Sequence, residues 1–350
     1  MANRDILAIG TSAGGFSALR HLASRFPRDL DATVLVVIHL PVGIESSLDA
    51  LLTQAGPLPA SFARDGDSME RSRIYIGPPA CHLLVDGARL RLGHGLRENY
   101  TRPAIDPLFR SAAVCCGHRT IGVVLTGTLG DGASGLQALK ACGGLTVVQD
   151  PSDAAFAEMP ATALRLARPD HVADLRAMPG LLAELVKSPA GRPVQAPERL
   201  EYEVDIARNG HSSMSTMDRI GRRSVMSRPD CNGVLWDIDE DDVVRFRCHV
   251  GHAYTAELLS LALDDNLRRA LGSALRALDE RVALARKLHQ VASDSGHRLL
   301  AESWSRKLRE AEEDAKVLRD STRRADEIAS RYAQGSSPDP VIAQARKQAG

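Results

Sequence analysis

Residues 5–20 constrain the fold of this 350-residue chain more than any other stretch. The apolar run Ile6-Leu7-Ala8-Ile9 ends abruptly in the small residues Gly10-Thr11-Ser12-Ala13-Gly14-Gly15, and a helical pattern follows. This order is typical of a buried strand, a tight turn and a helix. The glycines let the turn bend sharply, and the N-terminus of the helix directs free N–H groups toward the turn.

Ser12 lies in this turn, where a hydroxyl beside N–H donors suits a nucleophile next to an oxyanion site. Two other interpretations remain open for this stretch alone, a phosphate-binding turn and a plain tight turn. The phosphate interpretation lacks the G-x-G-x-x-G pattern, and no lysine follows as in a P-loop.

Composition limits the class of protein and its partners. Lys plus Arg and Asp plus Glu both number 44, so nothing favours nucleic acid or an anionic membrane as partner. The longest apolar run, 34–38, is too short to span a bilayer, and no signal peptide precedes the first strand. Six cysteines show no spacing of a secreted disulfide framework. We therefore expect a cytoplasmic protein that is not membrane-embedded.

Strand patterns alternate with helix patterns over residues 1–188. β-Branched runs without polar alternation, as at 33–38, 120–125 and 145–149, are typical of buried parallel strands. A two-residue turn, Asp86-Gly87, indicates a hairpin. The fold class predicted is α/β, a doubly wound, mostly parallel sheet with helices on both faces.

Three polar residues, Ser12, His39 and Asp131, each follow the carboxyl end of a predicted buried strand. Those ends share one edge of a parallel sheet, so the three side chains are expected to meet there. A serine, a histidine and an aspartate together are the parts of an acyl-transfer triad. Singly, His39 is also readable as a core histidine and Asp131 as a helix N-cap.

Five motifs in this order resemble the catalytic domain of the chemotaxis protein-glutamate methylesterases, the CheB family. They are Gly10-Thr11-Ser12-Ala13-Gly14-Gly15, Ile38-His39-Leu40-Pro41, Tyr75-Ile76-Gly77-Pro78, Arg102-Pro103-Ala104-Ile105-Asp106 and Leu125-Thr126-Gly127-Thr128-Leu129-Gly130-Asp131-Gly132. The resemblance implies hydrolysis of glutamate γ-methyl esters on methylated chemoreceptor-like proteins, together with glutamine deamidation. It implies no cofactor for catalysis, and it matches the triad to Ser12, His39 and Asp131.

The resemblance also suggests an oxyanion or substrate-binding role for Ala13, Gly14, Thr128 and Arg102. Ala13 and Thr128 depart from the threonine and methionine that the family often has there. Many relatives carry an N-terminal receiver domain, and here only four residues precede the first strand, so control by an attached receiver is not expected. The alternative function is a non-catalytic signalling scaffold that binds a receptor or kinase through an inactive esterase domain.

The second half is predicted to begin with a linker at 189–227, followed by a small β-rich module at 228–256. The module resembles a degenerate zinc ribbon, with candidate ligands Cys231, Cys248 and His252. Arg228 stands where the first cysteine is expected, and structural zinc normally takes four ligands. A metal-free module is therefore favoured, and zinc remains the alternative.

Residues 257–334 carry heptad stripes that predict a helical hairpin or coiled coil, and 335–350 are expected to be a disordered tail. The first stripe runs from Leu271 to Ala285 and the second from Trp304 to Ala325. The expected role is homo-oligomerisation or partner docking, and the alternative is a hairpin that packs only on itself.

Overall fold

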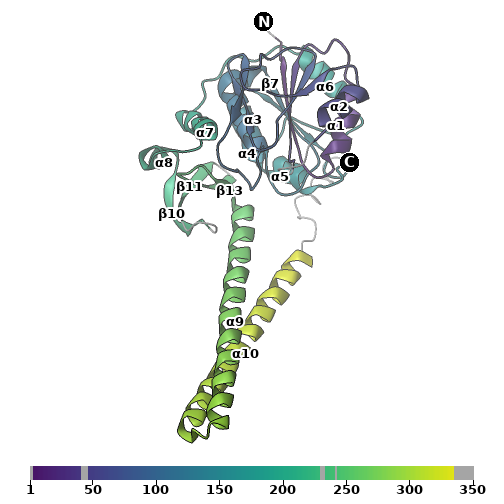
Figure 1. Ribbon diagram of the computed structural model, residues 1–350. Coiled ribbons are helices and arrows are strands. Elements are labelled where there is room, and N and C mark those ends of the chain that lie inside the picture. Colours follow the sequence, from purple (N-terminus) through teal and green to yellow (C-terminus); the bar gives the residue numbers. More distant parts are fainter. Residues whose placement is uncertain (1–2, 41–45, 229–232, 241–242, 335–350) are drawn as a thin grey trace. The chain divides into compact units, whose positions relative to one another are not determined.

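The structure is a computed structural model, and it describes residues 3–40, 46–228, 233–240 and 243–334. The chain divides into two compact units, Met1–Ser260 and Leu261–Gly350 (Figure 1). The first unit holds both sheets, and the second holds nearly all of two long helices. Within the described ranges, no helix is long and apolar enough to cross a membrane.

A seven-stranded sheet in the order β3-β4-β2-β1-β7-β8-β9 forms the centre of the first unit, and each of its pairings is parallel. Its strands are β1 (Ile6–Thr11), β2 (Thr33–Ile38), β3 (Ala60–Phe62), β4 (Arg73–Ile76), β7 (Thr120–Val124), β8 (Leu145–Gln149) and β9 (His171–Ala173). This arrangement confirms the predicted α/β fold class, because parallel strands joined by helical crossovers place their carboxyl ends at one edge.

Helices cover both faces of this sheet (Figure 1). Along β1, Ile6 and Ala8 pack on one face, whereas Leu7 and Ile9 pack on the other, as the two-residue period of a strand requires. The first face is covered by α3 (Ile105–Cys116), α4 (Ala133–Ala141) and α5 (Glu158–Ala167). The second face is covered by α1 (Gly15–Ala23), α2 (Leu48–Ala55) and α6 (Met178–Lys187).

The predicted hairpin is present as β5 (His82–Asp86) and β6 (Arg89–Gly93). The segment 189–227, expected to be a linker, instead forms α7 (Glu198–Asn209), α8 (Met214–Ile220) and β10 (Arg222–Ser227). A Pro-rich segment before α7 and the buried Glu203 on its inner face obscure the helical pattern in the sequence. The inner face also holds Leu200 and Val204, which are buried.

A second sheet is antiparallel, in the order β10-β11-β12-β13. Its other strands are β11 (Val234–Glu240), β12 (Val243–Cys248) and β13 (Ala253–Thr255). Trp236, Phe246 and Tyr254 are buried within it. Strands β11 to β13 lie in the β-rich module expected at 228–256, and β10 extends their sheet into the segment expected to be a linker. The sheet lies in the same compact unit as the parallel sheet.

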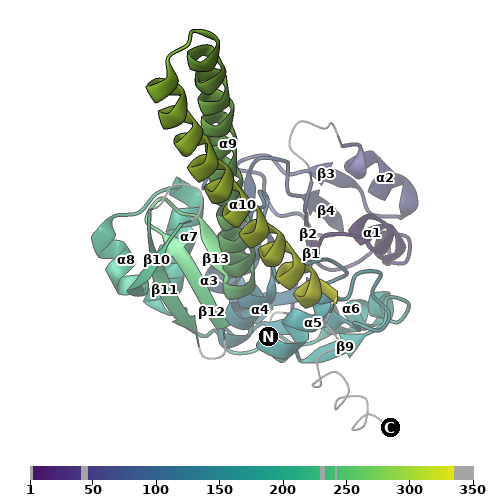
Figure 2. The same ribbon diagram turned by 90° about the horizontal axis from the view of Figure 1, so that it is seen from below.

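The long helices α9 (Ala256–Asp294) and α10 (Arg298–Gln334) form an antiparallel hairpin (Figures 1 and 2). Ala285, Ala311 and Ala315 are buried between them, and an Arg286–Glu312 ion pair of 2.7 Å joins their outer faces. The predicted helical hairpin is therefore present. The side chain of Ala325 and the tail 335–350 lie outside the described part of the chain.

Candidate functional site

Ser12 lies in the turn between β1 and α1, and the turn is fixed from both sides. The Ser12 N–H donates to the carbonyl of Thr126 at 3.0 Å, and the Gly15 N–H donates to the Ser12 carbonyl at 2.9 Å. Gly14 has φ +75°, and a Cβ there would lie 3.1 Å from Thr126 Oγ1, so the position favours glycine. The turn therefore holds the Ser12 hydroxyl at the carboxyl edge of the sheet.

His39 follows β2 and joins Ser12 to Asp131. Its Nδ1 lies 3.0 Å from Ser12 Oγ, and its Nε2 lies 2.8 Å from Asp131 Oδ2. A carboxylate only accepts, so Nε2 carries the proton and Nδ1 is left to accept from the Ser12 hydroxyl. The side chain of His39 is 17% exposed and that of Asp131 is 2% exposed, so the contact is largely shielded from water.

Asp131 is held as a carboxylate by four donors. Oδ2 accepts from the Ile105 N–H at 2.7 Å as well as from His39. Oδ1 accepts from Asn99 Nδ2 at 3.0 Å and from the Asp106 N–H at 3.2 Å. Burial acts to raise the pKa of Asp131, but the hydrogen bond and charge of His39, with the Ile105 and Asn99 donors, bring it below its usual value.

Asp106 is a second buried carboxyl beside Asp131. Burial and the negative charge of Asp131 raise the pKa of Asp106 to about 7. Its Oδ1 accepts from the N–H groups of Gly132 at 3.1 Å and Gly135 at 2.7 Å, and Asn99 Nδ2 donates to its Oδ2 at 3.2 Å. The Asn99 amide therefore bridges the two carboxyl groups.

Three sequence-predicted oxyanion residues, Ala13, Gly14 and Thr128, flank Ser12 on two turns. Within the described residues, no acceptor is recorded for their backbone N–H groups. The neighbouring Leu129 N–H, in contrast, donates to Glu158 at 3.0 Å. Unpaired amides beside a nucleophile are the donors that a tetrahedral oxyanion requires. Because such donors belong to the backbone, alanine at position 13 and threonine at position 128 are compatible with the predicted role.

Arg102 lies apart from this group. Its Nη1 donates to the Gly95 carbonyl at 2.9 Å, and no contact with Ser12, His39 or Asp131 is recorded among the described residues. Arg102 lines a cavity of about 390 Å³ together with residues that include Arg97 and His252. The cavity lies between the 96–102 segment and the antiparallel sheet.

The candidate metal ligands are only partly described. Cys248 Sγ and His252 Nδ1 lie 3.6 Å apart, and Cys231 lies outside the described residues. Arg228 donates from Nε to Tyr254 Oη at 2.9 Å. In the described part of the chain, no three or more His, Cys, Asp or Glu side chains are arranged to hold a metal ion.

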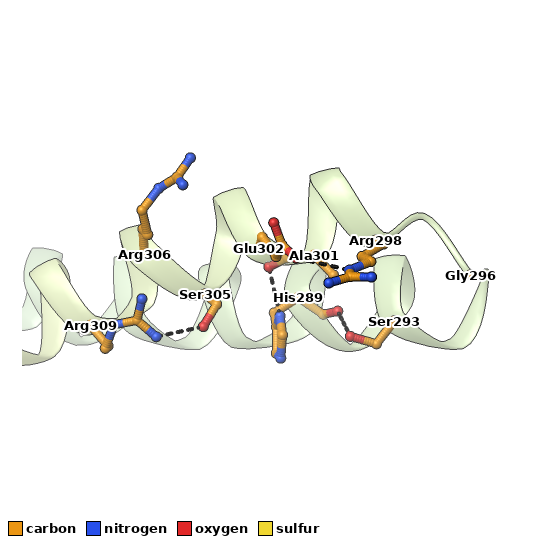
Figure 3. Close-up of a pocket in the computed structure, with 9 residues that line it drawn as sticks. All are labelled: His289, Ser293, Gly296, Arg298, Ala301, Glu302, Ser305, Arg306 and Arg309. Atoms are coloured by element: carbon orange, nitrogen blue, oxygen red, sulfur yellow. Dashed lines mark hydrogen bonds and ion pairs between the residues drawn. The ribbon is translucent and has the colours of Figure 1, made fainter.

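A cavity of about 560 Å³ lies in the second unit, at the turn between α9 and α10 (Figure 3). Several of its polar side chains have partners within the hairpin. His289 Nδ1 donates to the Ala301 carbonyl at 3.0 Å, and Arg298 donates to Glu302 at 3.1 Å. No triad residue lines it, so the cavity has no part in the chemistry described above.

Asn99 is the site residue that the sequence motifs did not indicate. The sequence offers only a local indication of a turn at this position. Asn99-Tyr100 stands between Glu98 and Thr101 in a segment without a strand or helix pattern. Asparagine is the residue that, after glycine, most readily adopts positive φ, and here φ is +51°. That signal predicts a turn but not its contact with Asp131.

Comparison with known proteins finds similarity in the first unit. Residues 7–182 match the protein family described as CheB methylesterase. The chain is 34% identical over 192 residues to a Methanosarcina mazei protein named protein-glutamate methylesterase/protein-glutamine glutaminase 2, covering 53% of this chain and 52% of that protein. A Leptospira interrogans protein named putative protein-glutamate methylesterase/protein-glutamine glutaminase is 32% identical over 184 residues, covering 52% of this chain and 95% of that protein.

A solved structure is also similar. The crystal structure of the Thermotoga maritima CheB methylesterase catalytic domain superposes with a TM-score of 0.50 and 29% identity, covering 53% of this chain and 100% of that one. This chain therefore spans about half the length of the Methanosarcina relative and nearly all of the Leptospira relative.

Proposed function

The chain belongs to the CheB methylesterase family, and we therefore propose that it hydrolyses glutamate γ-methyl esters on methylated chemoreceptor-like proteins. We propose glutamine deamidation as its second reaction. The observation that carries the proposal is the continuous path from Ser12 Oγ through His39 to Asp131, with distances of 3.0 and 2.8 Å. A chain retained only as a binding scaffold has no need of this path.

The proposed reaction uses the contacts of Ser12, His39 and Asp131 described above. Ser12 Oγ attacks the ester carbonyl while its proton moves to His39 Nδ1, and Asp131 stabilises the imidazolium through Nε2–H. The backbone N–H groups of Ala13, Gly14 and Thr128 are the donors that we propose for the tetrahedral oxyanion. Collapse of this intermediate transfers the proton from His39 to the leaving oxygen and releases methanol. Water then attacks the acyl-enzyme with His39 as base, which releases the glutamate product and restores Ser12.

This chemistry requires no cofactor, because each proton transfer and each charge has a partner in the chain itself. We place the reaction in the cytoplasm, on a methylated receptor segment. Arg102 is proposed to contact that segment from the edge of its cavity, since a guanidinium suits acidic peptide groups. The antiparallel sheet is proposed to be stable without zinc, although Cys231, Cys248 and His252 remain the ligand set to test.

The helical hairpin is proposed to bind a second copy of this chain. Leu284, Val291 and Val317 are more than half exposed on helices whose inner seam is already filled by alanines. Light scattering tests this proposal, because Leu284→Ser on the exposed surface should lower the oligomeric mass, as should Trp304→Ala if the seam itself takes part in the association. A strictly monomeric wild-type protein would leave the hairpin packed only on itself.

Methanol release from a methylated receptor fragment tests the proposed reaction. Ser12→Ala should lower turnover on the order of 10⁴-fold or more while the fold is retained. Ser17→Ala, an exposed serine on α1, is the matched control and should keep wild-type turnover. Near wild-type turnover of Ser12→Ala would refute the proposal.

A further inference from the structure

The Asn99 side chain lies at the centre of the buried carboxyl pair. Asn99 is 5% exposed, Asp106 is 2% exposed and Asp131 is 1% exposed, so water has little access to these groups. The Asn99 Nδ2 group donates to Asp131 Oδ1 at 3.0 Å and to Asp106 Oδ2 at 3.2 Å. A hydrogen bond to a charged acceptor in a buried site is among the stronger contacts in proteins. The position of Asn99 therefore bears directly on the carboxylate that orients His39.

Asn99 is presented by a tight turn in an unfavourable backbone conformation. Glu98 and Thr101 exchange two backbone hydrogen bonds, of 3.2 and 2.9 Å, and close a two-residue hairpin turn. Asn99 has φ +51° and Tyr100 has φ +63°. Such a turn is most often Asn-Gly, because a residue with a Cβ resists positive φ at the second position. Tyr100 therefore has to be held in place by contacts from elsewhere.

Those contacts come from the antiparallel sheet. The Asn99 N–H donates to the carbonyl of Ala253 in β13 at 2.9 Å. Glu98 pairs through Oε1 with Arg247 of β12 at 2.9 Å. The rings of Tyr100 and Tyr254 meet edge to face, with centroids 5.2 Å apart. Three consecutive residues of the turn are thus fixed by β12 and β13.

A buried charge cluster locks this junction. It contains three arginines and two glutamates, each 3% exposed or less: Glu98, Arg110, Glu203, Arg245 and Arg247. Glu98 also pairs with Arg110 of α3, and Glu203 of α7 pairs with Arg245 at 2.8 Å. Removing one partner of a buried ion pair leaves an uncompensated charge, so the cluster has few alternative arrangements.

We propose that the antiparallel sheet is a working part of the hydrolytic site, holding the Glu98–Thr101 turn so that Asn99 positions the carboxylate of Asp131. Asn99 is then a positioning residue, which acts on the substrate only through Asp131 and His39. This inference rests on the triad assignment of the proposed function. It assigns to β12 and β13 a role in catalysis, although they lie more than 60 residues beyond the family match at 7–182.

The first test measures covalent labelling of Ser12 by a fluorophosphonate probe in the full-length protein. The probe reports serine reactivity without any receptor substrate. Asn99→Gly keeps the positive-φ turn and removes the amide, so the maximal labelling rate should fall about 10- to 100-fold with little change in probe affinity. Asn209→Gly is the matched control, since it makes the same substitution at an exposed residue at the end of α7, outside the turn. Its labelling should stay within about twofold of wild type.

The outcomes separate this inference from the proposed function. An Asn99→Gly protein that labels at more than half the wild-type rate would overturn the inference and leave the triad intact. A wild-type protein that is not labelled, or a Ser12→Ala protein that is, would overturn the triad assignment and the inference with it.

The second test compares two neutralised carboxylates of the same cluster. Glu98→Gln and Glu203→Gln each remove one buried charge, but only Glu98 belongs to the turn. Labelling should fall more in Glu98→Gln, and adding Tyr100→Gly should restore most of it because glycine holds the positive φ unaided. Equal losses in the two variants, or no rescue by Tyr100→Gly, would show that the sheet contributes only general stability and would refute the inference.

Discussion

His39 contacts Ser12 with Nδ1 and Asp131 with Nε2, so in the proposed mechanism the position of the proton on the imidazole decides whether Ser12 is activated. Asp131 only accepts, and this fixes the proton on Nε2. A group at position 131 that donates would force the proton to Nδ1, the nitrogen that must receive the serine proton.

Asp131→Asn is therefore expected to lower turnover by about 10⁴-fold with substrate affinity nearly unchanged, because the amide favours the wrong tautomer of His39. Methanol release measures the effect. Asp170→Asn is the control, since Asp170 accepts from Thr146 at the opposite, amino end of the strands, and it should keep wild-type turnover. Equal activity in the two variants would contradict the assigned role of Asp131.

The raised pKa of Asp106 should make the free energy of unfolding depend on pH. Its folded pKa of about 7 lies above the usual value of 3.8, so between these pH values the folded protein binds more protons than the unfolded chain. This contribution is fully present below pH 4 and is lost as pH rises through 7. Between pH 4 and 8, wild type should lose roughly 2–4 kcal/mol more unfolding free energy than Asp106→Asn does. Denaturant titrations at several pH values measure this, and parallel profiles would contradict it.

Among the residues of the candidate site, the sequence indicates those that follow predicted strands and misses Asn99. Ser12, His39 and Asp131 each follow a β-branched or apolar strand, and strand ends converge in a parallel sheet. Asn99 follows no strand. Its placement depends on Ala253 and Arg247, about 150 residues away, and no local pattern encodes such packing.

At the scale of elements, the turn after β7 packs directly against the turn after β1. The Gly127 N–H donates to Phe156 at 3.0 Å, and the Gly127 carbonyl accepts from Met159 at 3.0 Å, so Gly127 is held on both sides. A Cβ at this position would lie 2.9 Å from Ser12 Cβ. The two turns therefore have no room for an added methyl group.

Gly127→Ala should displace Ser12 and lower turnover about 10- to 100-fold, because small misplacements of reacting groups are costly. Gly180→Ala on α6 is the control. No atom lies within 4 Å of its Cβ position, and the substitution should stabilise the helix slightly. Turnover and melting temperature measured together distinguish a displaced serine from a general loss of stability.

Helices and strands were predictable where the spacing of apolar residues in the sequence matches the face that is buried. The parallel strands and the helical hairpin follow from apolar runs and heptads, whereas α7 was expected to be part of a linker. The buried face of α7 includes Glu203, which is stable there because Arg110, Arg245 and Arg247 surround it. A buried charged residue interrupts the apolar period from which a helix is predicted, and its distant partners cannot be identified from the sequence.

The whole chain divides into two compact units at Ser260, so the predicted esterase segment 1–188 shares a unit with the residues that follow it up to Ser260. The first unit contains the triad, Asn99, α7 and the antiparallel sheet. We therefore expect that the residues needed for hydrolysis end near residue 260 and that the residues after it can be removed.

A chain ending at residue 260 is expected to fold and to retain turnover within about twofold of the full chain. A chain ending at 197 loses Glu203 and Arg247, which leaves Arg110 and Glu98 with fewer partners in a buried site, and it should be insoluble or inactive. Circular dichroism and methanol release on both proteins check this. An active protein ending at 197 would contradict the result expected from the charge cluster.

The long sequence separations within the site have a consequence for refolding. Ser12 and His39 are 27 residues apart, His39 and Asp131 are 92 apart, and Glu98 and Arg247 are 149 apart. Closing such loops is slow compared with forming helices, whose contacts are local. During refolding from denaturant, helical signal should therefore return well before a reactive serine does. If β12 and β13 hold the Glu98–Thr101 turn as proposed, Ser12 should become reactive in a nascent chain only after β13 has been added.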